Sequence, residues 1–260
     1  MRRNKKYDSL CRTPRKRKLA PLFKNFDDTV VLSCLQGHMG SAYVDDLNHP
    51  TVAQIIVGIF VFYAGDPDAD EANELLHNLP DFTLATVKTE EWKKKIETLH
   101  KGSFEKIKRY EFYKNPNHLN QDHIKKSVRH IPEGYELKPI DLRLAEDPSL
   151  HELSEDFISQ FNSTKDFVDR GMGFVLLHKG KAVCGATSFS IYDDGIEIEV
   201  ATHPDYRKKG LATVTASALI LECLSQGLYP SWDAANMESV KLAEKLGYKF
   251  KTEYETYVIG

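Results

Sequence analysis

The sequence predicts a mixed α/β (α+β) protein with two domains, and three observations support this prediction. Segments with a strand pattern alternate with segments with a helix pattern along most of the 260 residues. A tight turn at 179–181 joins two apolar stretches as in a β-hairpin. Residues 196–212 have the pattern of a strand, a basic glycine loop and the start of a buried helix. We expect a basic flexible extension at 1–20, an N-terminal α/β domain at 21–130 and a second domain at 131–260.

The composition is that of a globular protein, with 41% hydrophobic residues, 28% charged residues and a formal net charge of −3. This charge gives no general reason to expect nucleic-acid binding, and the nine Lys or Arg residues within 1–20 are interpreted as a solvated extension. No apolar run approaches the roughly 18 residues of a membrane span, and no signal peptide is visible. The spacing of the four cysteines is not that of a metal site, so we expect reduced thiols, a cytoplasmic location and no bound metal. These cysteines are Cys11, Cys34, Cys184 and Cys223.

In the N-terminal domain, alternating patterns predict strands and helices but no chemical motif. Apolar Thr29–Leu35 predicts a buried strand, followed by a glycine turn and a return strand at Ser41–Asp45. Pro50 favours the start of a short helix. The remaining predictions are strands at Ile55–Tyr63, Phe82–Lys88 and Lys106–Lys114, and helices at Ala69–Leu79, Glu90–His100 after the N-cap Thr89, and Leu119–His130. This domain could contribute to an acceptor cleft or to a homodimer.

The second domain has stronger turn and cap signals. Its predicted strands are Tyr135–Ile140, Gly173–His178, Ala182–Tyr192, the strand from Ile196, Leu228–Asp233 and a last β segment at Lys249–Ile259. Its predicted helices are segments from about Pro148 to Asp169, a buried helix at Leu211–Leu224 stopped by Gly227, and Met237–Leu246 between Asn236 as N-cap and Gly247 as C′ residue.

The loop at 207–210 has the chemistry of an anion site. Arg207, Lys208 and Lys209 supply positive charge, and Gly210 lets an anion approach the free N–H groups of a helix N-terminus. The sequence contains no competing motif, because its ten histidines form no metal-binding pair and no Gly-x-Ser-x-Gly elbow is present.

Arg207-Lys208-Lys209-Gly210-Leu211-Ala212 resembles the pyrophosphate signature Gln/Arg-x-x-Gly-x-Gly/Ala of the GNAT superfamily of acyl-CoA-dependent N-acetyltransferases. Asn236 through Tyr248 resembles the second signature, an Asn that opens a helix ending in Leu-Gly-aromatic. The resemblance covers about residues 133–259 and implies a central mixed, mainly antiparallel sheet flanked by helices. A narrower resemblance, to the bacterial subfamily that includes the zwittermicin A resistance acetyltransferase, starts near residue 21 and rests on Ser33–Gly40, Arg109-Tyr110, Ile196–Ile198 and Leu228–Ala234.

The resemblance implies that acetyl-CoA, the co-substrate, lies in a gap between two splayed strands. The backbone of Val200, Ala201 and Thr202 would pair with the pantetheine arm. Asn236 would bond to the same arm, although it also suits a helix cap, and both roles stay open. The full implied set is Val200, Ala201, Thr202, Arg207, Lys208, Lys209, Gly210, Leu211, Ala212, Thr213 and Asn236.

The expected reaction is direct attack of a small-molecule primary amine, with antibiotic-like amines among the candidates, on the thioester in a ternary complex. The amine must lose a proton, so a base is required, and a backbone N–H near Val200 could stabilise the oxyanion. Glu197 and Glu199 share one face of the strand and could act as base, bind a cationic substrate or form buried ion pairs. Asp233, at the end of the next strand, is the third candidate, and Trp232 could line the acceptor site.

One position departs from the superfamily pattern. The superfamily often has a Tyr general acid seven residues after the signature Asn, where this sequence has Ala243. Either the thiolate leaves unassisted, or Tyr248, Tyr254 or Tyr192 donates the proton. The departure also supports an alternative hypothesis, a non-catalytic acyl-CoA-binding sensor, which would bind CoA without turnover on any amine.

Overall fold

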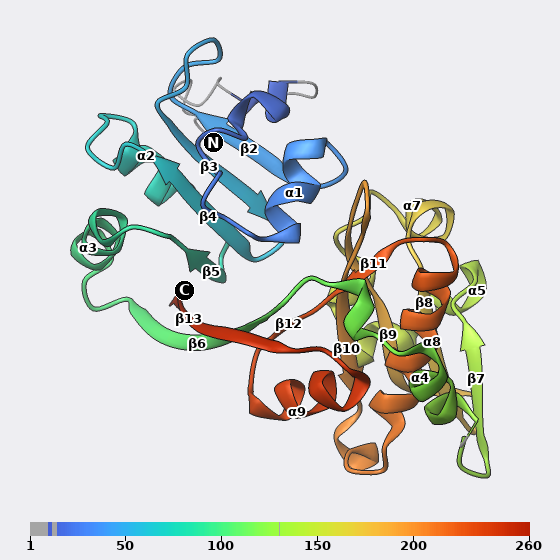
Figure 1. The fold of residues 1–260 in the computed structure, drawn as a ribbon. Coiled ribbons are helices and arrows are strands. Elements are labelled where there is room, and N and C mark those ends of the chain that lie inside the picture. Colours follow the sequence, from blue (N-terminus) through green and yellow to red (C-terminus); the bar gives the residue numbers. More distant parts are fainter. Residues whose placement is uncertain (1–9, 12–14, 130) are drawn as a thin grey trace. The chain divides into compact units, whose positions relative to one another are not determined.

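The computed structural model describes residues 10–11, 15–129 and 131–260 and contains two compact units (Figure 1). Unit 1 comprises the described residues up to Lys108 together with Glu255–Gly260, and unit 2 is Arg109–Tyr254. The unit limits fall inside β6 (Phe104–Phe112) and β13 (Phe250–Ile259), so the chain passes between units within two strands. These limits differ from the predicted domain limits at 20/21 and 130/131.

Unit 1 is built on a sheet whose strands lie in the order β1-β2-β3-β4-β5-β13. All neighbouring strands are antiparallel except β4 and β5, which are parallel. The strands are β1 (Leu10–Cys11), β2 (Ser41–Val44), β3 (Val52–Val57), β4 (Phe60–Gly65), β5 (Thr83–Thr86) and the end of β13; the helices are the 3₁₀ helix η1 (Arg15–Leu19), α1 (Thr29–Gln36), α2 (Ala72–His77) and α3 (Glu90–Leu99).

Alternating residues of β3 and β4 send their side chains to opposite faces of this sheet. On one face Tyr63 stacks on Trp92 of α3 with ring centroids 5.3 Å apart, and Gln54 Nε2 donates to the carbonyl of Leu75 in α2 at 2.9 Å. On the other face Phe62 meets Phe26, which precedes α1, edge-on at 5.8 Å. Figure 1 shows α1 and α2 on different sides of these strands.

Three predictions in the N-terminal part are wrong. Residues from Thr29 form helix α1 because the Asp28 side chain accepts the N–H groups of Val30 and Val31, and Gly37 ends the helix at a φ of 91°. The single strand predicted at Ile55–Tyr63 is the hairpin β3–β4, which turns at Gly58 with a φ of 57°. No helix begins at Pro50, since β3 starts two residues later.

The predicted basic extension is in part structured. Residues 1–9 and 12–14 lie outside the described residues, whereas η1 belongs to unit 1. Within η1, Leu19 is buried, and the Lys16 ammonium donates to the carbonyl of Gly40 at 2.7 Å. The remaining predicted elements of this part are present with shifted ends, and Thr89 caps α3 as expected by accepting the N–H of Trp92.

Unit 2 is built on a five-stranded sheet in the order β11-β10-β9-β8-β7. Its strands are β7 (Tyr135–Pro139), β8 (Gly173–His178), β9 (Lys181–Tyr192), β10 (Gly195–Thr202) and β11 (Tyr229–Ser231), while β12 (Asp233–Ala234) pairs with β6. Its helices are α4 (Gln121–Val128), α5 (Leu142–Ala145), α6 (Pro148–Leu153), α7 (Thr164–Arg170), α8 (Leu211–Ser225) and α9 (Met237–Leu246), with 3₁₀ helices η2 (Pro116–His118), η3 (Glu155–Phe157) and η4 (Pro204–Tyr206). Residue 130, the predicted end of the helix observed as α4, lies outside the described residues.

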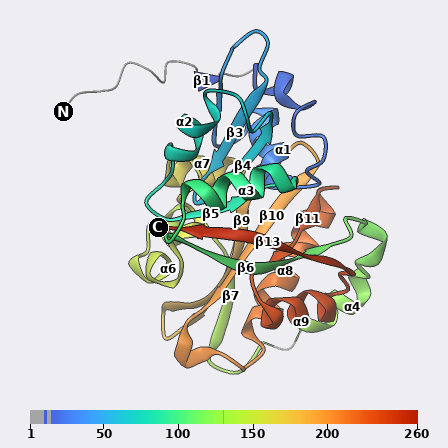
Figure 2. The same cartoon turned by 90° about the vertical axis from the view of Figure 1, so that its left-hand side faces the viewer.

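Helices cover both faces of the five-stranded sheet. On one face Cys184 Sγ lies 3.1 Å from Thr202 Oγ1 and 3.2 Å from Thr215 Oγ1 of α8. On the other face Gly185 leaves room for Phe157 of η3, whose ring would lie 2.6 Å from a Cβ at that position. Figure 2 shows α6 and α8 on opposite sides of the sheet.

The predicted mixed α/β fold class is therefore confirmed, and its elements are most accurate in unit 2. The limits of β8 and α9 match the prediction, with Asn236 and Gly247 as caps. The strand predicted at Leu228–Asp233 is wrong as a single element, because β11 and β12 belong to different sheets. Within residues 10–11, 15–129 and 131–260, no helix is long and apolar enough to cross a membrane, and no cluster of three or more potential ligands is placed to hold a metal ion.

Candidate active site

Strands β10 and β11 pair over a short stretch and then separate. Their parallel register runs from Gly195 opposite Tyr229 to Glu197 opposite Ser231, whereas β10 continues to Thr202. The chain leaves this sheet after Ser231 because β12 pairs with β6 instead. Among the described residues, the second half of β10 is consequently paired to β9 on one edge and has no strand on the other.

The backbone groups at the open edge follow from the pairing with β9. His203 N donates to the carbonyl of Val183 at 2.9 Å, so the backbone of His203 faces β9. Because successive residues alternate, the backbone groups of Thr202, Val200 and Ile198 point to the open edge, while those of Ala201 face β9. The Thr202 carbonyl already accepts Arg207 Nε at 3.3 Å. Of the three predicted pantetheine-pairing residues, Val200 is thus the best placed.

A β-bulge lies where the two strands begin to part. The register with β9 shifts between Glu197 and Ile198, leaving Phe189 of β9 as the additional residue. Bulges increase the local twist of a strand pair and re-aim its side chains. Here the bulge lies directly after Glu197, the last residue of β10 that pairs with β11.

The loop before α8 has a conformation that exposes backbone donors. Lys208 has a φ of 60° and Gly210 a φ of 79°, both in the left-handed region. A left-handed lysine costs about 1 kcal/mol, a strain that proteins commonly retain at functional sites. Gly210 is the N-cap of α8 and provides no side-chain cap, and a Cβ there would meet no atom within 4 Å. The first turn of α8 therefore has room for an external anion.

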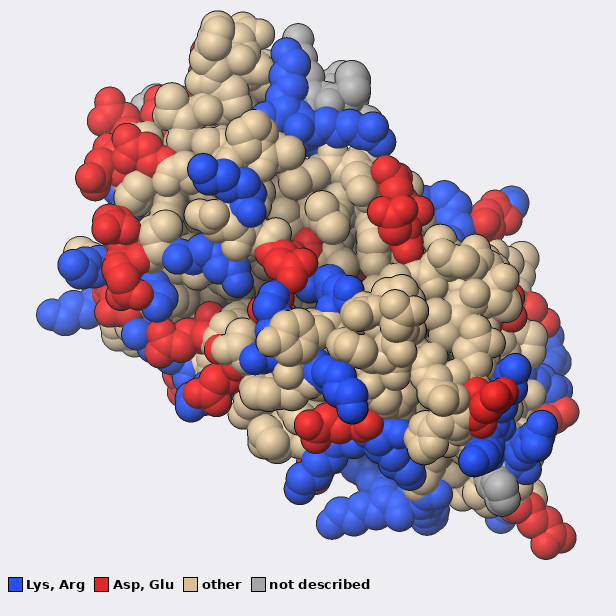
Figure 3. Space-filling view, in the orientation of Figure 1, with Lys and Arg blue, Asp and Glu red and all other residues tan. Residues whose placement is uncertain are grey.

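Basic side chains surround this helix end. Arg207, Lys208 and Lys209 are exposed, and Lys209 Nζ lies 4.7 Å from the centre of the Tyr206 ring and donates to the Asp205 carbonyl at 3.1 Å. Figure 3 shows Lys and Arg side chains gathered over this loop and α9. In the part of the chain that the structure describes, none of the three has a carboxylate within 4.0 Å.

Lys245 of α9 joins this group, and the sequence had not singled it out. Its Nζ lies 3.4 Å from Oγ1 of Thr213, which is in the first turn of α8. The two residues are 32 positions apart in the sequence. Lys245 is not one of the fixed positions of either signature. Only packing of α9 against α8 brings them together.

Acidic side chains lie on the face of β10 opposite α8. Glu197 is 7% exposed and Glu199 is partly buried. The pKa of Glu199 is raised to about 7, mainly by burial and also by the nearby charges of Asp156 and Glu197, while the charge of Arg109 acts to lower it. Asp156, from η3, was not predicted, since it comes from a segment without a motif. A carboxyl with a pKa near 7 is suited to accept a proton at neutral pH.

The third carboxylate candidate, Asp233, is engaged in a structural network. Its Oδ1 accepts Arg109 Nε at 2.8 Å and lies 2.7 Å from Nη2, and its Oδ2 accepts the Tyr254 hydroxyl at 2.8 Å. A carboxylate held by a buried guanidinium is a poor base, because the positive charge stabilises its ionised form. This arrangement favours Glu199 over Asp233 as the base.

The tyrosines considered as proton donors are also engaged. Tyr248, fully buried, donates to the Pro230 carbonyl at 2.6 Å, and burial raises its pKa well above the usual value. The Tyr192 hydroxyl donates to the Tyr229 carbonyl at 3.4 Å. Ala243 is completely buried in α9. These contacts leave none of the candidate tyrosines as an evident acid.

Asn236 and Trp232 have clear structural roles. Asn236 Oδ1 accepts the N–H of Ser239 at 2.9 Å and so caps α9. Trp232 is 6% exposed, and its Nε1 donates to Ser239 Oγ at 3.1 Å. The cap leaves the Asn236 amide nitrogen for a ligand, whereas Trp232 is mainly a core residue.

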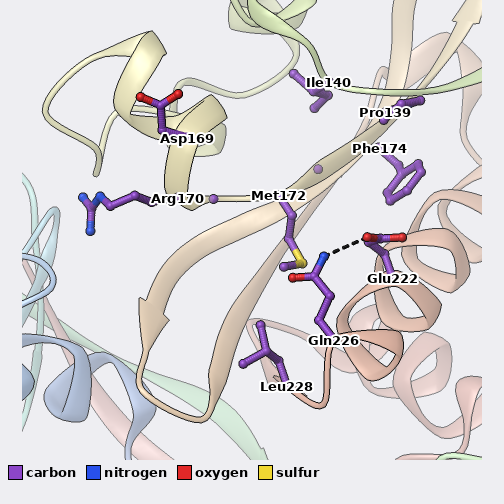
Figure 4. Close-up of a pocket in the computed structure, with 11 residues that line it drawn as sticks. Pro139, Ile140, Asp169, Arg170, Met172, Phe174, Glu222, Gln226 and Leu228 are labelled. Atoms are coloured by element: carbon purple, nitrogen blue, oxygen red, sulfur yellow. Dashed lines mark hydrogen bonds between the residues drawn. The ribbon is translucent and has the colours of Figure 1, made fainter.

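A separate hollow of about 710 Å³ lies near the start of β8 and the end of α8 (Figure 4). In this close-up, Gln226 donates to Glu222. The hollow includes none of the predicted site residues. Its lining consists of Pro139, Ile140, Asp169, Arg170, Gly171, Met172, Gly173, Phe174, Glu222, Gln226 and Leu228.

Comparisons with known proteins agree with this geometry. The family model described as GNAT acetyltransferase matches residues 20–257. A curated relative, the uncharacterized N-acetyltransferase YdfB of Bacillus subtilis, is 31% identical over 265 residues, which cover 94% of this chain and 97% of that protein.

Solved structures give the same result. The GCN5-related N-acetyltransferase-like protein of Streptococcus suis is 37% identical, covers 95% of this chain and 98% of its own, and superposes with a TM-score of 0.87. The GCN5-related N-acetyltransferase of Kribbella flavida, at 13% identity, 80% and 86% coverage and a TM-score of 0.54, shares the fold. GNAT enzymes generally take their acetyl group from acetyl-CoA. The splayed edge of β10, the basic loop before α8 and these matches together show that the chain is an enzyme of the GNAT acetyltransferase family.

Proposed function

We propose that this enzyme transfers the acetyl group of acetyl-CoA to the primary amine of a small cationic molecule, with Glu199 as the general base. The observation that carries the proposal is the position of Glu199 on β10, directly before Val200 at the open edge, combined with its pKa of about 7. Proton removal by a group with this pKa is efficient near neutral pH.

The chain's own residues fit acetyl-CoA in two places. The backbone of Val200 at the open edge of β10 can pair with the amides of an extended pantetheine arm, as a neighbouring strand would. The uncapped first turn of α8 and the side chains of Arg207, Lys208 and Lys209 suit a pyrophosphate. When bound, the thioester supplies the acetyl group and the thiolate leaving group.

The acceptor side is acidic. Glu197, Glu199 and Asp156 interact electrostatically, so this face would attract a cationic amine. Glu199 would accept the proton that the attacking nitrogen loses, and Glu197 would help to hold a second positive group of the acceptor. We assign no general acid, because a thiolate can leave without protonation.

An antibiotic-like aminopolyol is one candidate acceptor within this class. Its support is the resemblance of Ser33–Gly40 and Leu228–Ala234 to the zwittermicin A resistance acetyltransferases. Polyamines and peptide N-termini are the competing acceptors that a screen must include.

Co-substrate binding can be tested by calorimetric titration of acetyl-CoA into the wild type and Gly210→Glu. The variant places a carboxylate at the anion site and should lose detectable binding. Gly180→Glu is a matched control, because Gly180 also has a φ of 79° and open space around it but lies in the β8–β9 turn. Equal affinity of wild type and Gly210→Glu would refute the assignment of the loop.

The acceptor can be tested by thiol release across polyamines, aminoglycoside-like amines, aminopolyols and peptide N-termini. Turnover with polycationic small molecules and little with neutral peptides is expected. A preference for acidic or neutral acceptors would contradict the role assigned to the three carboxylates.

A further inference from the structure

The N-terminus of α8 is unusual in its electrostatics. Neither its N-cap, Gly210, nor its first turn is acidic, whereas every other α-helix of the described residues has an acidic residue at one of these places; α1, for example, has Asp28 as its N-cap, and α9 has Glu238 in its first turn. An acid in the first turn normally stabilises a helix, because the free N–H groups leave this end positive. The buried helix α8 lacks that stabilisation.

Lys245 adds a cation at this positive end. Its ammonium contacts Thr213 Oγ1 at 3.4 Å, and among the described residues no carboxylate lies within 4.0 Å of it. As a residue of the last turn of α9, Lys245 benefits from the negative end of its own helix. This favourable interaction with the end of α9 does not explain why the ammonium lies beside the first turn of α8. There the positive N-terminus of α8 and the cations of the loop repel it.

An anion in the same place would remove this repulsion. The loop supplies Arg207, Lys208 and Lys209 from one side, and Lys245 comes from another element. An ammonium has three donors, of which the contact with Thr213 uses one. The remaining donors can bind phosphate oxygens that also accept the N–H groups of the first turn.

We propose that Lys245 is a further phosphate-binding residue, which contacts the pyrophosphate of acetyl-CoA from α9 and is held there by Thr213. The inference rests on the proposed function, since it assigns a contact to the same co-substrate. It adds a determinant of donor specificity that lies outside the loop signature.

The test compares donors that differ in phosphate content. Lys245→Met should raise the KM for acetyl-CoA about tenfold and leave kcat within about twofold. The same increase is expected with acetyl-dephospho-CoA, which keeps the pyrophosphate. With acetyl-pantetheine, which has no phosphate, the KM of the variant should equal that of the wild type. Lys245→Arg, which keeps the charge, should recover most of the affinity for acetyl-CoA.

Lys241→Met is the matched control, because Lys241 is exposed on the same helix and the charge change is identical. An equal KM increase for Lys241→Met and Lys245→Met would overturn the proposal in favour of a general field effect. An equal increase with acetyl-pantetheine would also overturn it, since Lys245 would then act through the fold. Wild-type protein without affinity for acetyl-CoA would instead refute the proposed function itself, so the two failures are distinguishable.

Discussion

Replacing Glu199 by Gln should abolish most activity and at the same time stabilise the protein at alkaline pH. The raised pKa means that the folded state holds the Glu199 proton more tightly than the unfolded state, whose reference pKa is 4.5. Stability from this group is therefore present below pH 4.5 and is lost as the pH rises toward 7. Glutamine is neutral at every pH and does not pay this cost.

The magnitude follows from the two pKa values. Glu199 has a pKa of 4.5 in the unfolded state and about 7 in the folded state. Its contribution to the free energy of unfolding therefore falls by about 2.5 kcal/mol between pH 5 and pH 8, and we reduce this figure to about 2 kcal/mol because the side chain is partly exposed. The difference in the free energy of unfolding between Glu199→Gln and the wild type should therefore shift in favour of the variant by about 2 kcal/mol from pH 5 to pH 8. Urea unfolding at the two pH values measures it.

Activity provides the second half of the test. With an acceptor amine whose own pKa lies below 6, the kcat/KM of the wild type should rise about tenfold from pH 6 to a plateau above pH 7. The kcat/KM of Glu199→Gln should be lower than that of the wild type by at least about 100-fold. The reasoning fails if the variant keeps wild-type activity, or if its stability relative to wild type is the same at pH 5 and pH 8.

Two further predictions separate structural from catalytic roles. Asp233→Asn leaves the Arg109 charge buried and should lower the free energy of urea unfolding by about 3 kcal/mol, whereas Asp169→Asn at the exposed pair with Lys165 should lower it by less than about 1 kcal/mol. A loss of kcat of about 100-fold without loss of stability would instead identify Asp233 as the base. Tyr248→Phe removes the hydrogen bond to the Pro230 carbonyl and should lower the free energy of unfolding by about 1–2 kcal/mol, while kcat stays within about twofold of the wild-type value. A large fall in kcat in the folded variant would instead identify Tyr248 as the general acid.

Sequence reasoning was most reliable where local signals agree with tertiary structure. The hairpin at 179–181 and the helix between Asn236 and Gly247 carry their own turn and cap residues, so their limits could be predicted. The anion loop was recognisable because its charges and glycine are contiguous.

Prediction failed where packing decides between alternatives. Thr29–Leu35 is a short apolar run, which suits a buried strand or a buried helix equally well, and the cap at Asp28 was overlooked. Residues 228–233 gave no sign of a change of sheet, because pairing partners are not encoded locally. Asp156 and Lys245 were missed for the same reason, since each reaches the site from a distant segment.

The separation of β10 from β11 also has a cost outside catalysis. A strand whose backbone donors and acceptors are unpaired can recruit a strand from another molecule. Three features discourage such pairing here: the unpaired stretch is short, a β-bulge lies beside it, and β10 carries the acidic side chains of Glu197 and Glu199. A bound pantetheine arm would complete the edge, so the co-substrate would also act as a removable terminal strand that guards the sheet against self-association.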